Sequence, residues 1–182
     1  AVSVDSQPIK MLRYTAKKYS VAVSFGYYEL CDEAIYSSYM FIGKNGEIVN
    51  NFRRVSKGWK EYDITDEHYK EGDGFKTFTY MGKRIALAVC GDLWYEENIE
   101  QINKEKFDFL LYPVYVTYNT EMWRTKLVNE YAEQAKKIPR PVFLVNSICD
   151  ADNTRGGCYA FLNGKTVCEV PMGQDGYLLV RV

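Results

Sequence analysis

The sequence contains few of the residues that commonly mark a recognisable site. It has one histidine, His68, and five cysteines without Cys-x-x-Cys spacing, namely Cys31, Cys90, Cys149, Cys158 and Cys168. A papain-like Cys–His pair would depend on His68, which lies in a polar segment typical of a surface loop. An odd number of cysteines in this pattern argues against a zinc site or a disulfide framework. We therefore expect no metal and a reducing, cytoplasmic setting.

An excess of charge of one sign is also missing. Lys plus Arg number 23 and Asp plus Glu number 24, which gives a formal net charge of -1 without any basic run. We therefore do not expect nucleic acid or an anionic membrane as a partner. No apolar stretch approaches the roughly 20 residues that a membrane-spanning helix needs. The sequence also lacks a G-x-G-x-x-G or Walker motif, so nothing indicates nucleotide binding.

What remains is the composition of an ordinary globular protein, with 182 residues, 47% hydrophobic and 26% charged. We expect one mixed α/β domain over residues 1–182. Helical spacing predicts helices at 8–18, 95–105 and 120–138. Apolar runs and alternation predict strands at 21–26, 38–43, 47–54, 75–80, 84–89, 107–114, 141–148, 158–162, 166–170 and 177–182. The dipeptides Asn45-Gly46 and Asn163-Gly164 each predict a tight hairpin turn.

The most informative stretch begins with a continuous apolar run from Ile85 to Val89, which reads as a strand buried on both faces. Cys90 ends the run, Gly91 and Asp92 break it, and a helix is expected soon afterwards. A thiol at such a turn is well placed to be a nucleophile, with nearby backbone N–H groups to bind an oxyanion. The alternative is a small buried core thiol. We expect Asp92 to cap the following helix.

Several segments together resemble the nitrilase (carbon–nitrogen hydrolase) superfamily. They are Phe25-Gly26-Tyr27-Tyr28-Glu29, Phe52-Arg53-Arg54-Val55, Glu71-Gly72, Val89-Cys90-Gly91-Asp92-Leu93-Trp94, Leu111-Tyr112-Pro113, Val145-Asn146 and Gly156-Gly157-Cys158. The resemblance implies an αββα sandwich, N-terminally incomplete here, that assembles into a homodimer or larger. It also implies a cofactor-free enzyme that hydrolyses a small non-peptide amide or nitrile through a cysteine thioester.

The resemblance also suggests roles for particular residues. Cys90 matches the nucleophile, and the amide of Gly91 would be one oxyanion donor. Glu61 matches a second catalytic Glu, although a solvated loop carboxylate is the alternative. Substrate-binding positions fall on Trp94, Tyr115 and Asn146. For Asn146 the alternative role is simply to end a strand.

The cation beside the oxyanion departs from the family pattern. The superfamily has a lysine at this point, whereas Arg54 occupies the place here, with Lys57 and Lys60 close behind. Arginine keeps its charge permanently, so it could stabilise an oxyanion but could not pass on a proton. The sequence leaves open whether Arg54, Lys57 or Lys60 supplies the charge.

The general base of the family is the main absence. The family carries it on a Glu that precedes every segment matched here, and Glu29 matches a different Gly-x-x-Glu segment. We therefore expect these residues to be a fragment of a longer protein, and the chain alone to be essentially inactive as a hydrolase. The alternative is a binding or assembly module of the same fold whose thiol is not used.

Overall fold

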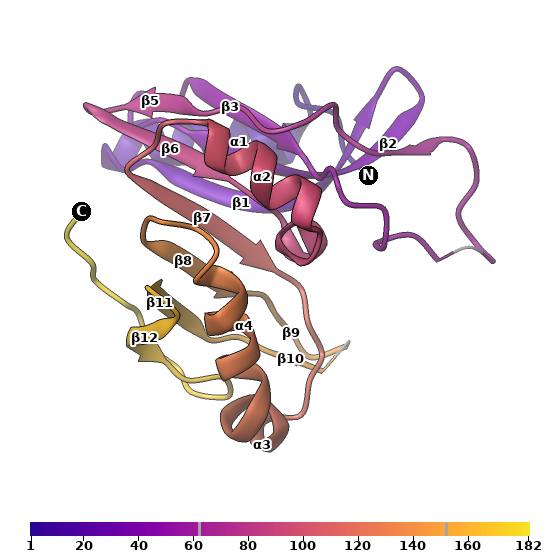
Figure 1. The fold of residues 1–182 in the computed structure, drawn as a ribbon. Helices are drawn as coiled ribbons and strands as arrows, with labels where there is room; N and C mark the ends of the chain where they lie inside the picture. Colours follow the sequence, from indigo (N-terminus) through magenta and orange to yellow (C-terminus); the bar gives the residue numbers. More distant parts are fainter. Residues whose placement is uncertain (62, 152) are drawn as a thin grey trace.

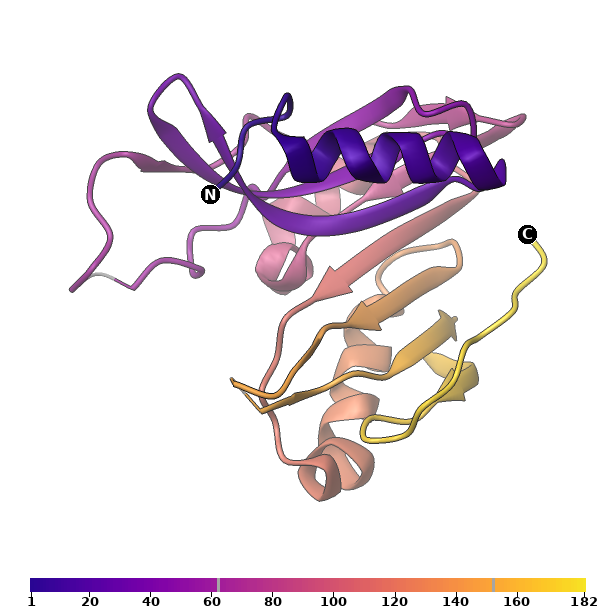
Figure 2. The ribbon, with the colours of Figure 1, turned by 180° about the vertical axis from the view of Figure 1, so that it is seen from behind.

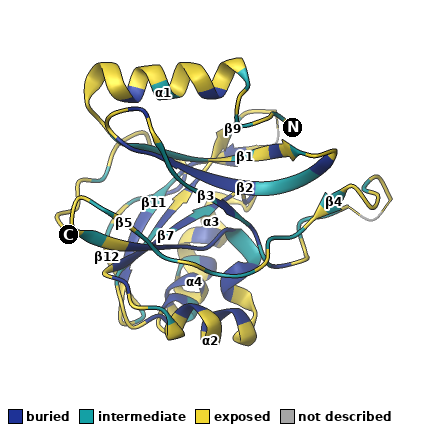
Figure 3. Ribbon diagram, turned by 90° about the horizontal axis from the view of Figure 1, so that it is seen from above, coloured by how far each residue is buried: buried dark blue, intermediate teal, exposed yellow. Residues whose placement is uncertain are grey.

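Two β-sheets face one another in the computed structural model, and helices cover their outer faces to give four layers (Figure 3). The structure describes residues 1–61, 63–151 and 153–182. The first sheet has the order β1-β2-β3, with β4 pairing in parallel to β2. Its strands are β1 (Val23–Cys31), β2 (Ala34–Ile42), β3 (Ile48–Arg53) and β4 (Tyr69–Lys70). Helix α1 (Gln7–Tyr19) covers its outer face (Figures 2 and 3).

The second sheet has the order β12-β11-β8-β7-β6-β5. Its strands are β5 (Phe78–Tyr80), β6 (Lys83–Leu87), β7 (Phe109–Val114), β8 (Val142–Asn146), β11 (Cys158–Leu162) and β12 (Lys165–Val170). Strands β6, β7 and β8 are parallel, while β5, β11 and β12 pair antiparallel. Its outer layer contains α2 (Glu96–Lys104), α3 (Thr120–Met122), a π-helical turn η2 (Trp123–Leu127) and α4 (Val128–Ala135) (Figure 1). A small ribbon of β9 (Ile148–Cys149) and β10 (Thr154–Arg155) lies between β8 and β11 in sequence.

Side-chain alternation explains the layering. In β6 and the residues after it, Ile85, Leu87 and Val89 pack between the two sheets, whereas Ala86 and Ala88 pack toward α2 and α4. Because both faces of this strand are buried, its sequence is continuously apolar. Strand β2 alternates in the same way, with Tyr39 and Phe41 between the sheets and Met40 and Ile42 against α1.

Most of the predicted elements are confirmed, and the exceptions have local causes. The strand predicted to end at Gly26 continues to Cys31, because Gly26 pairs with Tyr39 within the β1–β2 ladder. The strand predicted at 177–182 is wrong. This segment lies outside both sheets as an extended chain (Figure 2), and Tyr177 and Leu179 are 82% and 86% exposed. Within the described ranges, no helix is long and apolar enough to cross a bilayer.

Candidate active site

Cys90 lies at a sharp turn after β6. It is the first residue of a short 3₁₀ helix, η1 (Cys90–Trp94), and its φ of 47° is in the left-handed region. A non-glycine residue pays about 1–2 kcal/mol for this conformation, and such strain is concentrated at functional sites. Cys90 is half-buried, and its thiol forms no disulfide with another described residue. The turn therefore presents a free thiol.

Two neighbouring elements hold this turn in place. The buried Tyr112 of β7 donates its hydroxyl proton to the carbonyl oxygen of Cys90. Gln134 of α4 donates to the carbonyl oxygen of Leu93, at the other end of η1. The strained backbone of Cys90 is thus fixed by the second sheet and by the helix that covers it.

Asp92 connects the turn to the other sheet. Its Oδ2 accepts the Val89 amide at 2.8 Å, and its Oδ1 accepts the amides of Val55 and Ser56 at 3.1 and 2.7 Å. Its side chain is fully buried. Burial raises the pKa of the Asp92 carboxyl above its usual range, against the opposing effect of these hydrogen bonds and of the positive charge of Arg54.

Asp92 does not cap α2, as expected from the sequence, but the short helix η1, where its carboxylate accepts the amide of the N-cap residue Val89. Tyr95 is the N-cap residue of α2, and its side chain makes no capping hydrogen bond. Asp92 bonds back to Val89 and across to the loop that follows β3, since the extra turn η1 separates it from the helix.

Arg54 follows β3 and lies directly against the nucleophile turn. It is 7% exposed, and its Nε donates to Ser56 Oγ at 2.7 Å. A Cβ built on Gly91 would lie 2.3 Å from Arg54 Nη2, so only a glycine permits this approach. Lys57 is exposed, and Lys60 forms an ion pair with Glu71 at 2.8 Å. Of the three candidate cations, the geometry favours Arg54.

Three other candidate residues are Glu61, Trp94 and Tyr115. Glu61 is exposed, and its backbone carbonyl accepts hydrogen bonds from Thr65. Trp94 is 44% exposed and stands edge-on to Tyr131, with ring centroids 5.1 Å apart. Tyr115, in the segment after β7, is 48% exposed. The roles of these residues stay predictions.

Asn146 is buried and makes several hydrogen bonds. Its amide group donates to the carbonyl oxygens of Val116 and Gly156 at 3.2 and 3.1 Å, and its Oδ1 accepts the Val116 amide at 3.0 Å. Both amide protons are thereby used. The side chain joins the segments after β7 and β10, and a role in substrate binding stays a prediction.

One site residue was not singled out from the sequence. Tyr131 belongs to the apolar face of the helix predicted at 120–138, which we interpreted only as core. Burial raises the pKa of its hydroxyl, with a further contribution from nearby Cys90, and Arg54 acts in the opposite direction. Tyr131 thus lies near both the thiol and the guanidinium. Periodicity alone could not distinguish this position from ordinary packing.

Glu29 is already engaged away from the thiol. It is 2% exposed and accepts hydrogen bonds from Arg53 at 2.7 and 3.0 Å and from Ser38 at 2.7 Å. Burial would raise the pKa of Glu29, but these hydrogen bonds outweigh it and hold the pKa below the ordinary value. The carboxylate is therefore a structural partner of Arg53.

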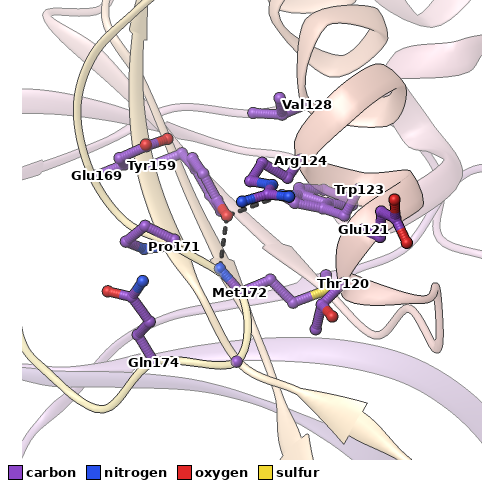
Figure 4. A pocket seen from close by; sticks show the side chains of 11 residues that line it. Thr120, Glu121, Trp123, Arg124, Val128, Tyr159, Glu169, Pro171, Met172 and Gln174 are labelled. Atoms are coloured by element: carbon purple, nitrogen blue, oxygen red, sulfur yellow. Dashed lines mark hydrogen bonds between the residues drawn. The ribbon is translucent and has the colours of Figure 1, made fainter.

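A cavity of about 620 Å³, separate from the turn that carries Cys90, lies between η2 and the chain after β12 (Figure 4). None of the predicted site residues lines it. Its wall includes Tyr159, whose hydroxyl accepts hydrogen bonds from Trp123 Nε1 and the Met172 amide at 2.8 and 2.7 Å. In the part of the chain that the structure describes, no group of three or more His, Cys, Asp or Glu side chains could hold a metal ion.

Comparison with known proteins gives consistent matches. The carbon-nitrogen hydrolase family profile matches residues 1–182. Citrullinase from Francisella tularensis is 25% identical over 119 residues, which are 62% of this chain and 40% of that protein. The carbon-nitrogen hydrolase of Helicobacter pylori superimposes with a TM-score of 0.73 at 16% identity, covering 91% of this chain and 63% of that one.

An amidase from Nesterenkonia sp. AN1 adds a chemical comparison. Its Glu-to-Gln variant superimposes with a TM-score of 0.72 at 15% identity, over 90% of this chain and 62% of that one. That structure shows the acetamide moiety of fluoroacetamide added covalently at the active-site cysteine. The chain thus spans about two fifths of citrullinase and less than two thirds of these solved structures.

Proposed function

The chain belongs to the carbon-nitrogen hydrolase family, and from this premise we propose that it hydrolyses a small non-peptide amide or nitrile with Cys90 as the nucleophile. The observation that carries the proposal is the close approach of the Arg54 guanidinium to Gly91, directly after the strained Cys90 and its free thiol. This arrangement gathers a nucleophile, a backbone N–H and a positive charge at one turn. Acyl transfer needs these three groups.

The reaction with an amide has two stages. Cys90 Sγ attacks the carbonyl carbon and a tetrahedral oxyanion forms. The C–N bond then breaks as the nitrogen takes up a proton, so that ammonia or an amine leaves and a thioester remains. Water next attacks the thioester carbon, the C–S bond breaks, and a carboxylic acid leaves with the thiol regenerated.

The charge on the oxyanion is balanced by two groups in this proposal. The Gly91 N–H donates no backbone hydrogen bond within the described ranges, and Arg54 lies beside it. Removal of one such donor typically lowers the rate by about 10²–10³-fold. Lys57 is the second candidate cation, and Trp94, Tyr115 and Asn146 would line or shape the substrate pocket.

Proton transfer requires a carboxylate, and the two buried carboxylates among the described residues are engaged elsewhere. Glu29 is bound to Arg53, and Asp92 accepts three backbone amides. Glu61, in the loop after Arg54, would orient the substrate or water. We propose that a glutamate from an upstream segment is the base, and that the active form is a cytoplasmic homo-oligomer.

The test is ammonia release from a panel of simple amides and nitriles, measured for this chain and for a version extended upstream. We expect turnover only from the extended protein, and none after Cys90→Ala. Cys168→Ala is the matched control because that thiol is also half-buried, on β12. Comparable rates from both lengths would contradict the upstream base, while turnover that survives Cys90→Ala would contradict the nucleophile.

One observation favours a second function, a binding module whose thiol is not used. The two buried carboxylates among the described residues, Glu29 and Asp92, are bonded to Arg53 and to the Val89 amide. Intact-mass measurement of the extended protein separates the two functions. Binding of amides without any thioester adduct would identify the module, and a trapped adduct at Cys90 would identify the enzyme.

A further inference from the structure

Arg54 is an unusual buried charge. Its side chain is almost fully enclosed, yet no described residue forms an ion pair with it. Within the described ranges, its guanidinium donates from Nε to Ser56 Oγ, at 2.7 Å. Buried charges are ordinarily paired because removal from water costs several kcal/mol. Among the described residues, hydrogen bonds rather than a direct ion pair hold this guanidinium against Gly91.

Ser56 and Asp92 form the connection that does so. Ser56 accepts from Arg54 Nε through its hydroxyl oxygen, and its backbone amide donates to Asp92 Oδ1 at 2.7 Å. The Asp92 carboxylate also accepts the amide of Val55, so it holds the two residues that follow Arg54. The backbone of the Arg54 segment is thus fixed by one carboxylate, and the Arg54 side chain by the hydroxyl of Ser56.

The same carboxylate belongs to the nucleophile turn, where it accepts the Val89 amide. It therefore connects the end of β3 in the first sheet with the end of β6 in the second sheet. Hydrogen bonds to a charged group are about twice as strong as neutral ones. The distance between guanidinium and thiol is set at this junction, because the two groups come from different sheets.

We propose that Ser56 and Asp92 are positioning residues, which hold the Arg54 charge at the oxyanion side of Cys90. Neither residue needs to touch the substrate. This inference rests on the proposed function in one respect only, which is that an oxyanion forms beside Cys90 during catalysis. The placement itself predicts a fixed positive charge beside the thiol, in active and inactive protein alike.

The experiment compares alkylation of Cys90 by iodoacetate and by iodoacetamide, mapped by mass spectrometry. The same thiolate attacks both reagents, so the ratio of their rates cancels the thiolate fraction and reports the local charge. We expect Arg54→Gln to lower this ratio about fivefold, from the Coulomb interaction of two unit charges about 4 Å apart in bulk water. Ser56→Ala should lower it by a similar factor, and Ser56→Thr, which keeps the hydroxyl, should restore it.

Ser38→Ala is the matched control. Ser38 is another buried serine with a 2.7 Å hydrogen bond to a charged group, but its partner is Glu29. Its loss should leave the ratio at Cys90 unchanged. Asp92→Asn should lower the ratio as Ser56→Ala does. If Asp92→Asn does not fold, the Ser56 variants still test the inference.

Two results would overturn the inference. If Arg54→Gln leaves the ratio unchanged, the guanidinium does not act at Cys90. If Arg54→Gln lowers the ratio but Ser56→Ala does not, Ser56 does not position it. Neither result depends on amide turnover. If the alkylation ratios change as expected but the extended protein does not hydrolyse any amide or nitrile, only the proposed function is contradicted.

Discussion

Replacing Gly91 by alanine tests the contact on which the site depends. The added Cβ would lie 2.3 Å from Arg54 Nη2 and 3.1 Å from Ser56 Oγ, both closer than ordinary contact. The guanidinium must move by about 1 Å to restore a normal separation of about 3.5 Å. Its hydrogen bond to Ser56 is then strained or lost.

The size of the effect follows from two contributions. Overpacking at a buried position costs about 1–3 kcal/mol, and a weakened buried hydrogen bond costs about as much. We expect Gly91→Ala to lower the free energy of unfolding by about 2–3 kcal/mol. A unit charge that moves from about 4 to about 5 Å loses about 0.2 kcal/mol of interaction at the dielectric constant of bulk water, about 80. The iodoacetate-to-iodoacetamide ratio at Cys90 should then fall by about 1.4-fold.

The assay is urea denaturation combined with the alkylation ratio, with Gly58→Ala as the matched control. Gly58 lies in the loop after β3, as Arg54 and Ser56 do, and a Cβ there would meet only Tyr95 Oη at 3.7 Å, an ordinary contact. The free energy of unfolding of Gly58→Ala should stay within about 0.5 kcal/mol of that of the parent protein. Equal stability and an equal ratio for the two variants would refute the packing of Arg54 against Gly91.

Three further outcomes are expected. Cys90→Gly should be more stable than Cys90→Ala by about 1 kcal/mol in thermal or urea unfolding, because glycine accepts the φ of 47° without strain; equal stabilities would contradict a strained turn. Glu29→Gln should cost about 1.5–3 kcal/mol at neutral pH, since a hydrogen bond to a charged group is lost. The Glu29 pKa is lowered in the folded state, so its contribution is present above the ordinary value of 4.5 and is lost as pH falls below it. The variant's stability should therefore fall less steeply in acid, and parallel acid-unfolding curves would count against this pairing. Light scattering of the extended protein should give a homodimer or larger, and a clean monomer at micromolar concentration would contradict the proposed assembly.

The sequence predicted those parts of the fold that depend on local pattern. The run from Ile85 to Val89 is confirmed as buried on both faces, with alternate side chains in two separate cores, although strand β6 itself ends at Leu87. Asn45-Gly46 is confirmed as a hairpin turn, with Gly46 at a φ of 83°. The turn between β1 and β2 was missed because its second positive-φ position holds Glu33, where a glycine is usual after a residue such as Asp32.

The site was predicted unevenly for a similar reason. Cys90 was found because it follows a strand whose pattern is local, and Arg54 because it occupies the place of the lysine in the resemblance to the superfamily. The partners of Asp92 lie 36 and 37 residues away, so its connection to Ser56 and Val55 depends on how the two sheets pack. Tyr131 approaches Cys90 only after α4 covers the second sheet. Helical spacing explains its burial but not which residue it approaches.

The most direct test of the central claim is covalent modification of the folded protein by fluoroacetamide, a weak electrophile. All five cysteines are half-buried, so exposure alone predicts similar labelling at every position. The account predicts that Cys90 gains one acetamide group well before any other thiol, and that Arg54→Gln slows this gain. Equal labelling of the five thiols, or faster labelling of Cys31 or Cys168, would contradict the assignment of Cys90 as the nucleophile.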